Sequence, residues 1–265
     1  LVLAGPNRMS RFNNLEFGSE SEDHSRSEGE FRDEKSYFAE ALAAFENGRF
    51  EQALQRFAKV LEFNPQNIAA WSGQVRMLIE LEEFHEAKVW ADKALERFPR
   101  DPELLAAKAV ALGRTGDLKA ALAFSDAAIE ERGDTPYIWL ARGDVLLARN
   151  EKRAAYCFEK AHLLAPLDWF VHWLASRIQL YYAKFALALK AAQQALAFEN
   201  TRAVVWLQLG KCQNALGMVG LAQTSFEQAL QLDHFCREAD QALAALKQAG
   251  FFASLRARLN GFFSR

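Results

Sequence analysis

The sequence predicts an all-α solenoid of about six helical hairpins that ends in a capping helix. Three observations lead to this prediction: one sequence unit recurs about every 34 residues, apolar residues inside the unit recur at intervals of three and four, and proline closes several units. The chain has 265 residues, 51% of them hydrophobic and 25% charged, which is typical of a soluble protein. This length suffices for one large or two small domains.

The repeat is defined by three columns of residues. Its central column is alanine, with spacings of 34, 34, 33, 34 and 34 residues: Ala53, Ala87, Ala121, Ala154, Ala188 and Ala222. An earlier column is mostly bulky: Tyr37, Trp71, Leu105, Trp139, His172 and Trp206. Four residues after each of these stands a mostly small column: Ala41, Val75, Ala109, Gly143, Ser176 and Gly210. Agreement in several columns indicates six copies of one structural unit.

Each unit fits two amphipathic helices joined by a short turn. The hairpins are expected near residues 35–63, 67–98, 101–132, 135–164, 168–198 and 202–232. Glycines mark three of the turns: Gly48, Gly116 and Gly217. Small residues allow the paired helices to approach closely, and the bulky column fills the space beside the neighbouring hairpin. Because one hairpin cannot bury its apolar face alone, the hairpins are expected to stack.

This order of bulky, small, glycine, alanine and proline positions resembles the tetratricopeptide repeat over residues 34–234. Repeat two carries the pattern most fully, with Trp71, Ala87 and Pro99, whereas repeat five departs from it with His172 in the bulky column. The resemblance implies a right-handed superhelical solenoid whose concave groove, lined by the first helix of each hairpin, binds other proteins. It does not name the partner.

The two ends differ from the repeats. Residues 1–33 form a tail that is expected to be disordered, because residues 16–34 hold eight acidic and two basic residues with few apolar ones. Residues 235–249 are expected to form the capping helix of a solenoid at 34–249. Residues 250–265 form a basic amphipathic segment, for which three uses remain: folding back as extra cap, lying on a membrane surface, or docking on a partner.

Motifs for catalysis, metal binding and phosphate binding are missing from the sequence. The three cysteines are widely spaced, the histidines fall at unrelated phases of the repeat, and the Gly210–Lys211 pair lacks the rest of a phosphate loop. The net charge of −2 gives no reason to expect nucleic acid as a ligand. We therefore expect no metal, no cofactor and no enzymatic activity. The cysteine pattern and the lack of a signal-like start favour a cytoplasmic protein.

The expected groove contains a mixture of basic, acidic, amide and aromatic residues. Its predicted members are Arg76, Arg114, Tyr137, Asp144, Trp173, Arg177, Tyr181, Gln208, Lys211 and Asn214. Arginine and aromatic residues dominate many binding hot spots. The relatives that hold a peptide C-terminus carry lysine and asparagine where this chain has Phe38, Leu42 and Gly73, so that ligand is not expected.

These observations predict a scaffold that binds a protein or peptide segment with acidic and apolar residues, as an adaptor or assembly factor. The alternative is a scaffold recruited to a membrane surface by residues 250–265, and an enzyme is the more distant alternative. A partner that uses the outer face of the stack, rather than the groove, is also compatible with the sequence.

Overall fold

The computed structural model describes residues 33–248, and their regular secondary structure is entirely helical. The predictions for the N-terminal tail up to residue 32 and for the basic segment 250–265 fall outside the described residues. Within the described range, no helix is long and apolar enough to cross a membrane.

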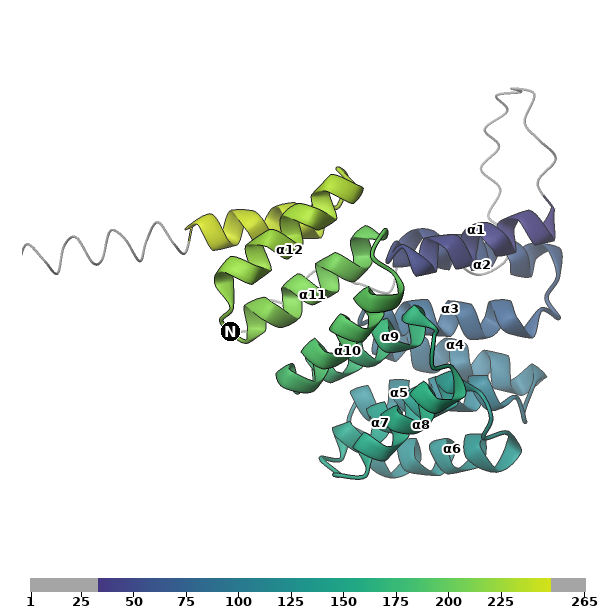
Figure 1. Cartoon of the computed structure of the whole chain (residues 1–265). Helices are drawn as coiled ribbons and strands as arrows, with labels where there is room; N and C mark the ends of the chain where they lie inside the picture. The colour runs from purple at the N-terminus through teal and green to yellow at the C-terminus, as the bar shows by residue number, and fades with distance from the viewer. Residues whose placement is uncertain (1–32, 249–265) are drawn as a thin grey trace, which may run out of the picture. The chain divides into compact units, whose positions relative to one another are not determined.

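The described helices follow one another as pairs (Figure 1). Their bounds are α1 Glu34–Glu46, α2 Phe50–Phe63, α3 Ile68–Glu80, α4 Phe84–Arg97, α5 Pro102–Arg114, α6 Leu118–Glu131, α7 Pro136–Ala148, α8 Ala154–Leu164, α9 Trp169–Tyr181, α10 Phe185–Phe198, α11 Ala203–Ala215 and α12 Val219–Leu232. Residues 237–248 are also helical and take the place of the predicted capping helix. The six predicted hairpins are confirmed, with ends within one residue of those expected.

The chain divides into two compact units, Leu1–Pro99 and Arg100–Arg265. The first unit contains α1 to α4, and the second contains α5 to α12 with the helical residues 237–248. In both units, the two helices of each hairpin pack against each other and most second helices pack on the first helix of the next hairpin. The all-α class is thus confirmed, while the right-handed superhelix stays a prediction.

The close approach of paired helices depends on the small column. A Cβ atom added to Gly210 would lie 2.6 Å from the Phe226 ring, and one added to Gly143 would lie 2.8 Å from the Phe158 ring. These distances are far below ordinary carbon contacts, so the phenylalanine of the second helix occupies the space of the missing side chain. The alanine column is buried throughout.

Every hairpin turn contains one residue in the left-handed conformation. Three of these are the predicted glycines Gly48, Gly116 and Gly217. The other three are Glu82, Asn150 and Ala183, with φ of 61°, 56° and 54°. Asparagine adopts left-handed backbone readily, but this conformation costs residues such as Glu82 and Ala183 roughly 1–2 kcal/mol, so the hairpin turn forms even where the residue does not favour it.

In four repeats, a residue of the bulky column ties the start of the hairpin to the preceding loop. The indole nitrogens of Trp71, Trp139 and Trp206 donate hydrogen bonds of 2.9, 2.7 and 2.8 Å to the carbonyl oxygen six residues earlier. In repeat five, His172 makes the corresponding bond from Nε2 to the Pro166 carbonyl, at 3.3 Å. The smaller imidazole thus replaces the tryptophan hydrogen bond without replacing its volume.

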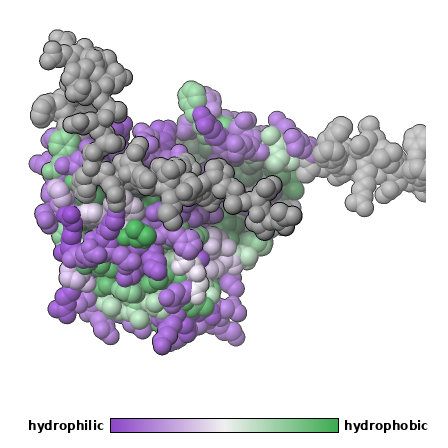
Figure 2. Space-filling view, turned by 180° about the vertical axis from the view of Figure 1, so that it is seen from behind, coloured by the Kyte–Doolittle hydropathy of each residue, from purple (hydrophilic) through white to green (hydrophobic). Residues whose placement is uncertain are grey.

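On the face shown in Figure 2, hydrophilic residues predominate and apolar residues reach the surface in several places. The largest exposed fractions among apolar side chains of the second unit belong to Leu163, Leu167 and Phe235. Exposed apolar residues of this size are candidates for contact with other molecules when they lie beside a cavity or a charged cluster.

Candidate functional site

The first helices of the second unit form one continuous layer. Helix α5 packs on α7, α7 on α9, and α9 on α11. Residues at the same place in the repeat therefore follow one another from helix to helix, as Asp144, Arg177 and Lys211 do. We call the side of this layer that carries these residues the first-helix face.

Four residues near the ends of α5, α7 and α9 make up what we call the Arg114 cluster: Arg114, Asp144, Tyr181 and Tyr182. Arg114 donates to both carboxylate oxygens of Asp144, from Nε at 3.0 Å and from Nη2 at 2.6 Å. The hydroxyl of Tyr182 donates to the same carboxylate at 2.7 Å. Asp144 is only 1% exposed, so its charge is neutralised by hydrogen bonds rather than by water.

The electrostatics of the Arg114 cluster keep its charge state fixed. Burial alone would lower the pKa of Arg114, but the charge and hydrogen bonds of Asp144, together with Tyr181 and Tyr182, outweigh burial and raise that pKa. Burial raises the pKa of Tyr182, and the nearby Asp144 carboxylate raises it further. Tyr182 therefore stays a neutral donor and Arg114 a cation at ordinary pH.

Tyr181 forms the outer part of the Arg114 cluster. The Arg114 guanidinium carbon lies 3.4 Å from the centre of the Tyr181 ring, which is a cation–π contact. The Tyr181 side chain is nonetheless 45% exposed. Its ring is thus fixed by the buried ion pair beneath it while its edge remains accessible to a partner.

A second group of charges, which we call the Lys211 cluster, contains Arg177 on α9, Lys211 on α11 and Glu238 of the last described helix. Lys211 forms an ion pair with Glu238. Burial would raise the pKa of Glu238, but the charges of Lys211 and Arg177 lower it overall. Both cations therefore act on one carboxylate, which supports the prediction that Arg177 and Lys211 share a face.

Three predicted groove residues are buried instead of being presented to a partner. Trp173 is fully buried and its indole nitrogen donates to the Val204 carbonyl at 3.3 Å. Gln208 is buried and donates to the Ser176 hydroxyl at 2.9 Å. Asp144 is the third, as described above, and the side chain of Arg114, which pairs with it, is only 7% exposed. Their placement differs from the prediction because the first helices pack against neighbours on two sides, which leaves a narrower exposed stripe than the repeat pattern suggested.

The remaining predicted residues lie at the surface or partly so. Arg177 and Lys211 are partly exposed, Tyr137 is half-buried at the start of α7, and Asn214 is exposed near the end of α11. Arg76 lies on α3 in the first unit, with its guanidinium 5.1 Å from the centre of the Phe45 ring. That these residues bind a partner stays a prediction.

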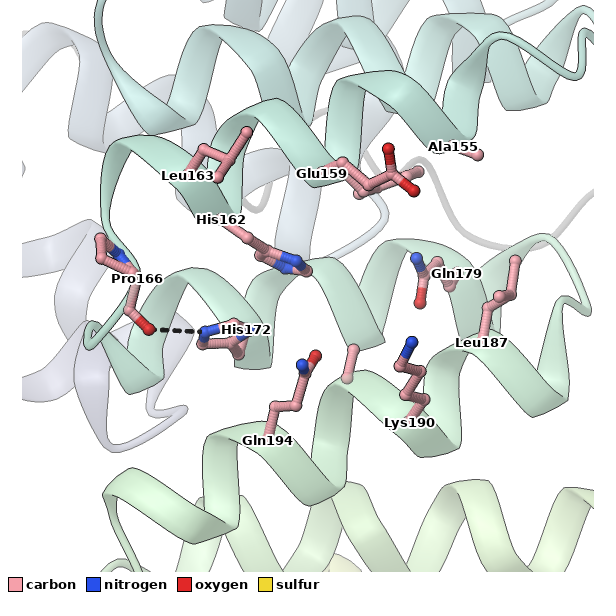
Figure 3. Close-up of a pocket in the computed structure, with 12 residues that line it drawn as sticks. Ala155, Glu159, His162, Leu163, Pro166, His172, Gln179, Leu187, Lys190 and Gln194 are labelled. Carbon is pink, nitrogen blue, oxygen red and sulfur yellow. Dashed lines mark hydrogen bonds between the residues drawn. The ribbon is translucent and has the colours of Figure 1, made fainter.

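A cavity that the sequence did not predict lies between α8, α9 and α10 (Figure 3). Its volume is about 560 Å³. The lining residues are Ala155, Phe158, Glu159, His162, Leu163, Pro166, His172, Gln179, Leu187, Lys190, Ala191 and Gln194. The one signal in the sequence was His172, the residue that departs from the bulky column.

The two histidines of this cavity lie against each other. The ring centres of His162 and His172 are 4.2 Å apart. Burial lowers the pKa of His162 to about 4, with further lowering by His172 and by the Lys190 ammonium. His162 is therefore neutral at physiological pH, and the cavity carries no imidazolium from this residue.

The described residues contain no group of three or more histidine, cysteine, aspartate or glutamate side chains placed to hold a metal ion. The thiols of Cys157 and Cys212 are buried, and burial raises the pKa of each. A thiol with a raised pKa forms little thiolate and is a poor nucleophile.

Stacked helical hairpins with a period of 34 residues define a helical-repeat protein. Models of the tetratricopeptide repeat family match residues 44–111 and 203–234. The chain is a tetratricopeptide repeat protein.

Several known proteins are similar to it. The BBSome complex member BBS4 of Bos taurus is 22% identical over 187 residues, which is 70% of this chain and 36% of that relative, so the chain spans about a third of the relative's length. A tetratricopeptide repeat protein from Parabacteroides merdae superimposes with a TM-score of 0.53, at 16% identity, over 81% of this chain and 84% of that one. The human IFIT1 dimer with m7Gppp-AAAA has a TM-score of 0.51 at 19% identity, over 81% of this chain and 56% of that one. At these identities the structural matches show the fold alone.

Proposed function

We propose that this protein is a non-catalytic scaffold that binds a protein or peptide segment on the first-helix face of its second unit, as an adaptor or assembly factor. The observation that carries the proposal is the placement of Arg177, Lys211 and the exposed ring of Tyr181 on that face. Interface hot spots are enriched in arginine and aromatic residues, which supply charge and contact area together.

The Lys211 cluster favours a partner with acidic residues. Lys211 and Arg177 bring two cations to the carboxylate of Glu238 at this end of the face. An acidic group of a partner is guided to such a site by charge complementarity. Apolar residues next to that group gain contact with the Tyr181 ring.

The comparisons support a binding role at a coarse level. The BBS4 relative is a member of a multi-protein complex by its name, which agrees with an assembly function. The IFIT1 structure contains a capped oligonucleotide. For this chain the net charge of −2 favours a protein segment over nucleic acid as the ligand.

The proposal is tested with a library of displayed peptides, selected on the full chain. Selected peptides are expected to be rich in glutamate or aspartate next to apolar residues. The double variant Arg177→Ala/Tyr181→Ala should weaken their binding at least tenfold, or about 1.4 kcal/mol, with the loss reduced at high salt. Lys211 is not reversed to glutamate, because a new carboxylate beside Glu238 would disturb the last helix.

Arg100→Ala is the matched control, because the Arg100 side chain is highly exposed and lies at the start of α5, away from the Lys211 cluster. It should bind the same peptides as the unaltered protein. Circular dichroism confirms that all variants are helical. If the Arg177→Ala/Tyr181→Ala variant folds and binds with unchanged affinity, the functional surface lies elsewhere.

A further inference from the structure

The cavity between α8, α9 and α10 exists because repeat five lacks a tryptophan. In repeats four and six, Trp139 and Trp206 occupy the bulky column and donate to a carbonyl six residues earlier. His172 keeps this hydrogen bond with a smaller ring. Helices α8 and α9 also pack less closely than the corresponding pairs α6/α7 and α10/α11. The missing volume remains as an accessible cavity rather than being closed by neighbouring side chains.

The cavity contains buried polar atoms without a hydrogen-bond partner. His172 is 3% exposed and Gln179 is 5% exposed. A carbonyl oxygen only accepts, so the bond to Pro166 places the proton of His172 on Nε2 and leaves Nδ1 of the neutral ring as an acceptor. Neither this Nδ1 nor Oε1 of Gln179 has a partner, and Nε2 of His162, which also lines the cavity, has none either. Buried polar groups in folded proteins are almost always paired, so these two acceptors indicate an absent donor.

Six of the twelve residues that line the cavity are apolar. Phe158 and Ala191 contribute to its walls, while Leu163 and Leu187 line it with 75% and 50% of their surface exposed. Figure 3 shows Leu163 on α8 and Leu187 on α10, the two helices that flank the cavity. Exposed leucines beside an apolar cavity are typical of surfaces that another molecule covers.

The charged residues of the cavity limit the class of ligand that it can bind. Lys190 extends toward Gln179 in Figure 3 and disfavours a cationic ligand. A carboxylate ligand would face the two unpaired acceptors, and Glu159 also lines the cavity. A neutral, flat apolar group with a hydrogen-bond donor can lie against the apolar half of the lining and donate to these acceptors. The volume of about 560 Å³ lies within the range of small-ligand sites.

We infer that this cavity binds a tryptophan side chain of a partner segment, with the indole N–H donating to His172 Nδ1 or Gln179 Oε1 and the ring lying on the apolar wall. Tryptophan donates and does not accept, which matches two acceptors. The inference goes beyond the proposed function, because the cavity is flanked by the second helices α8 and α10 and not by the first-helix face. Loss of either site leaves the other intact.

The test uses the full chain and a blocked Leu-Trp-Leu peptide, followed by nuclear magnetic resonance of the histidine ring protons. The resonances of His162 and His172 are expected to shift with saturation, while that of the exposed His85 in the first unit stays unchanged. A peptide with 1-methyltryptophan, which lacks the indole N–H, is expected to bind at least tenfold more weakly. This comparison isolates the hydrogen bond from the apolar contact.

Two variants test the assignment of the cavity. His172→Trp restores the bulky column of the family pattern and should fill the cavity, so that binding is lost while the protein remains folded. Gln179→Leu removes one acceptor at similar size and should weaken binding several-fold. His85→Gln is the matched control and should bind like the unaltered protein.

Three results would overturn the inference. The first is an absence of shifts at His162 and His172 up to the solubility limit of the peptide. The second is equal affinity for the 1-methyltryptophan peptide, which would mean that the unpaired acceptors play no part. The third is unchanged binding by a folded His172→Trp variant, which would place the peptide outside the cavity.

Discussion

The two charged clusters on the first-helix face occupy equivalent positions but have opposite exposure. Asp144 and Lys211 stand at the same place in their repeats, and each pairs with a residue of a neighbouring helix. Asp144 is enclosed because Tyr182, at the end of α9, covers it from the next repeat. Lys211 pairs with Glu238 of the last described helix and remains partly exposed. The same repeat position is therefore buried in one hairpin and partly exposed in another.

The largest effect on stability is expected at the Arg114 cluster. Asp144→Ala leaves the Arg114 guanidinium buried without its partner, which should lower the free energy of unfolding by about 3–5 kcal/mol. Urea unfolding followed by circular dichroism measures the change. The control is Asp126→Ala, which removes a partly exposed ion pair with Arg142 and should cost at most about 1 kcal/mol. Equal losses of unfolding free energy in the two variants would contradict the distinction between buried and exposed ion pairs.

A smaller effect is expected from the hydroxyl that covers Asp144. Tyr182→Phe removes one hydrogen bond to a charged group but keeps the ring and the Arg114 pair, so we expect a loss of about 1.5–3 kcal/mol. Tyr156→Phe is the control, because Tyr156 is exposed and should change stability little. A loss of stability near zero for Tyr182→Phe would mean that the hydroxyl does not stabilise the Arg114 cluster.

The ion pair of the Lys211 cluster should contribute little to stability. A double-mutant cycle with Lys211→Ala and Glu238→Ala is expected to give a coupling energy below about 1 kcal/mol, decreasing with added salt, because solvent screens the pair. Measurement at low and high salt separates screening from packing. A coupling of several kcal/mol that is independent of salt would show that this pair resembles the buried one.

The smallest expected effect is a pH dependence of the stability that Glu238 of the Lys211 cluster contributes. The pKa of Glu238 is lowered from its usual 4.5, so the unfolded chain binds a proton more readily than the folded one. Its contribution to stability is present above pH 4.5 and is lost as the pH falls through the lower folded value. Thermal unfolding from pH 6 downward should show a smaller decline for Glu238→Gln than for the unaltered chain. Identical declines of the melting temperature in the two proteins would show that Glu238 does not contribute to the loss of stability in acid.

The hairpins themselves could be predicted from the sequence. The alanine column and the glycine turns fix where two helices meet, since these depend on residues close together in one repeat. The position of the tryptophan column also followed from spacing, although its hydrogen bond to a carbonyl six residues earlier did not. His172 was recognised as a departure, but the cavity beside it was not foreseen.

The sequence by itself determined the period, the hairpin bounds and the all-α class, because these follow from local spacing of apolar and small residues. Only the tertiary structure decided which polar residues are buried. Asp144 is closed off by Arg114 and Tyr182, which lie 30 and 38 positions away in other repeats. Packing likewise imposes the left-handed turn at Ala183, although alanine disfavours that backbone conformation. Exposure depends on contacts between repeats, and a pattern that describes one repeat does not contain them.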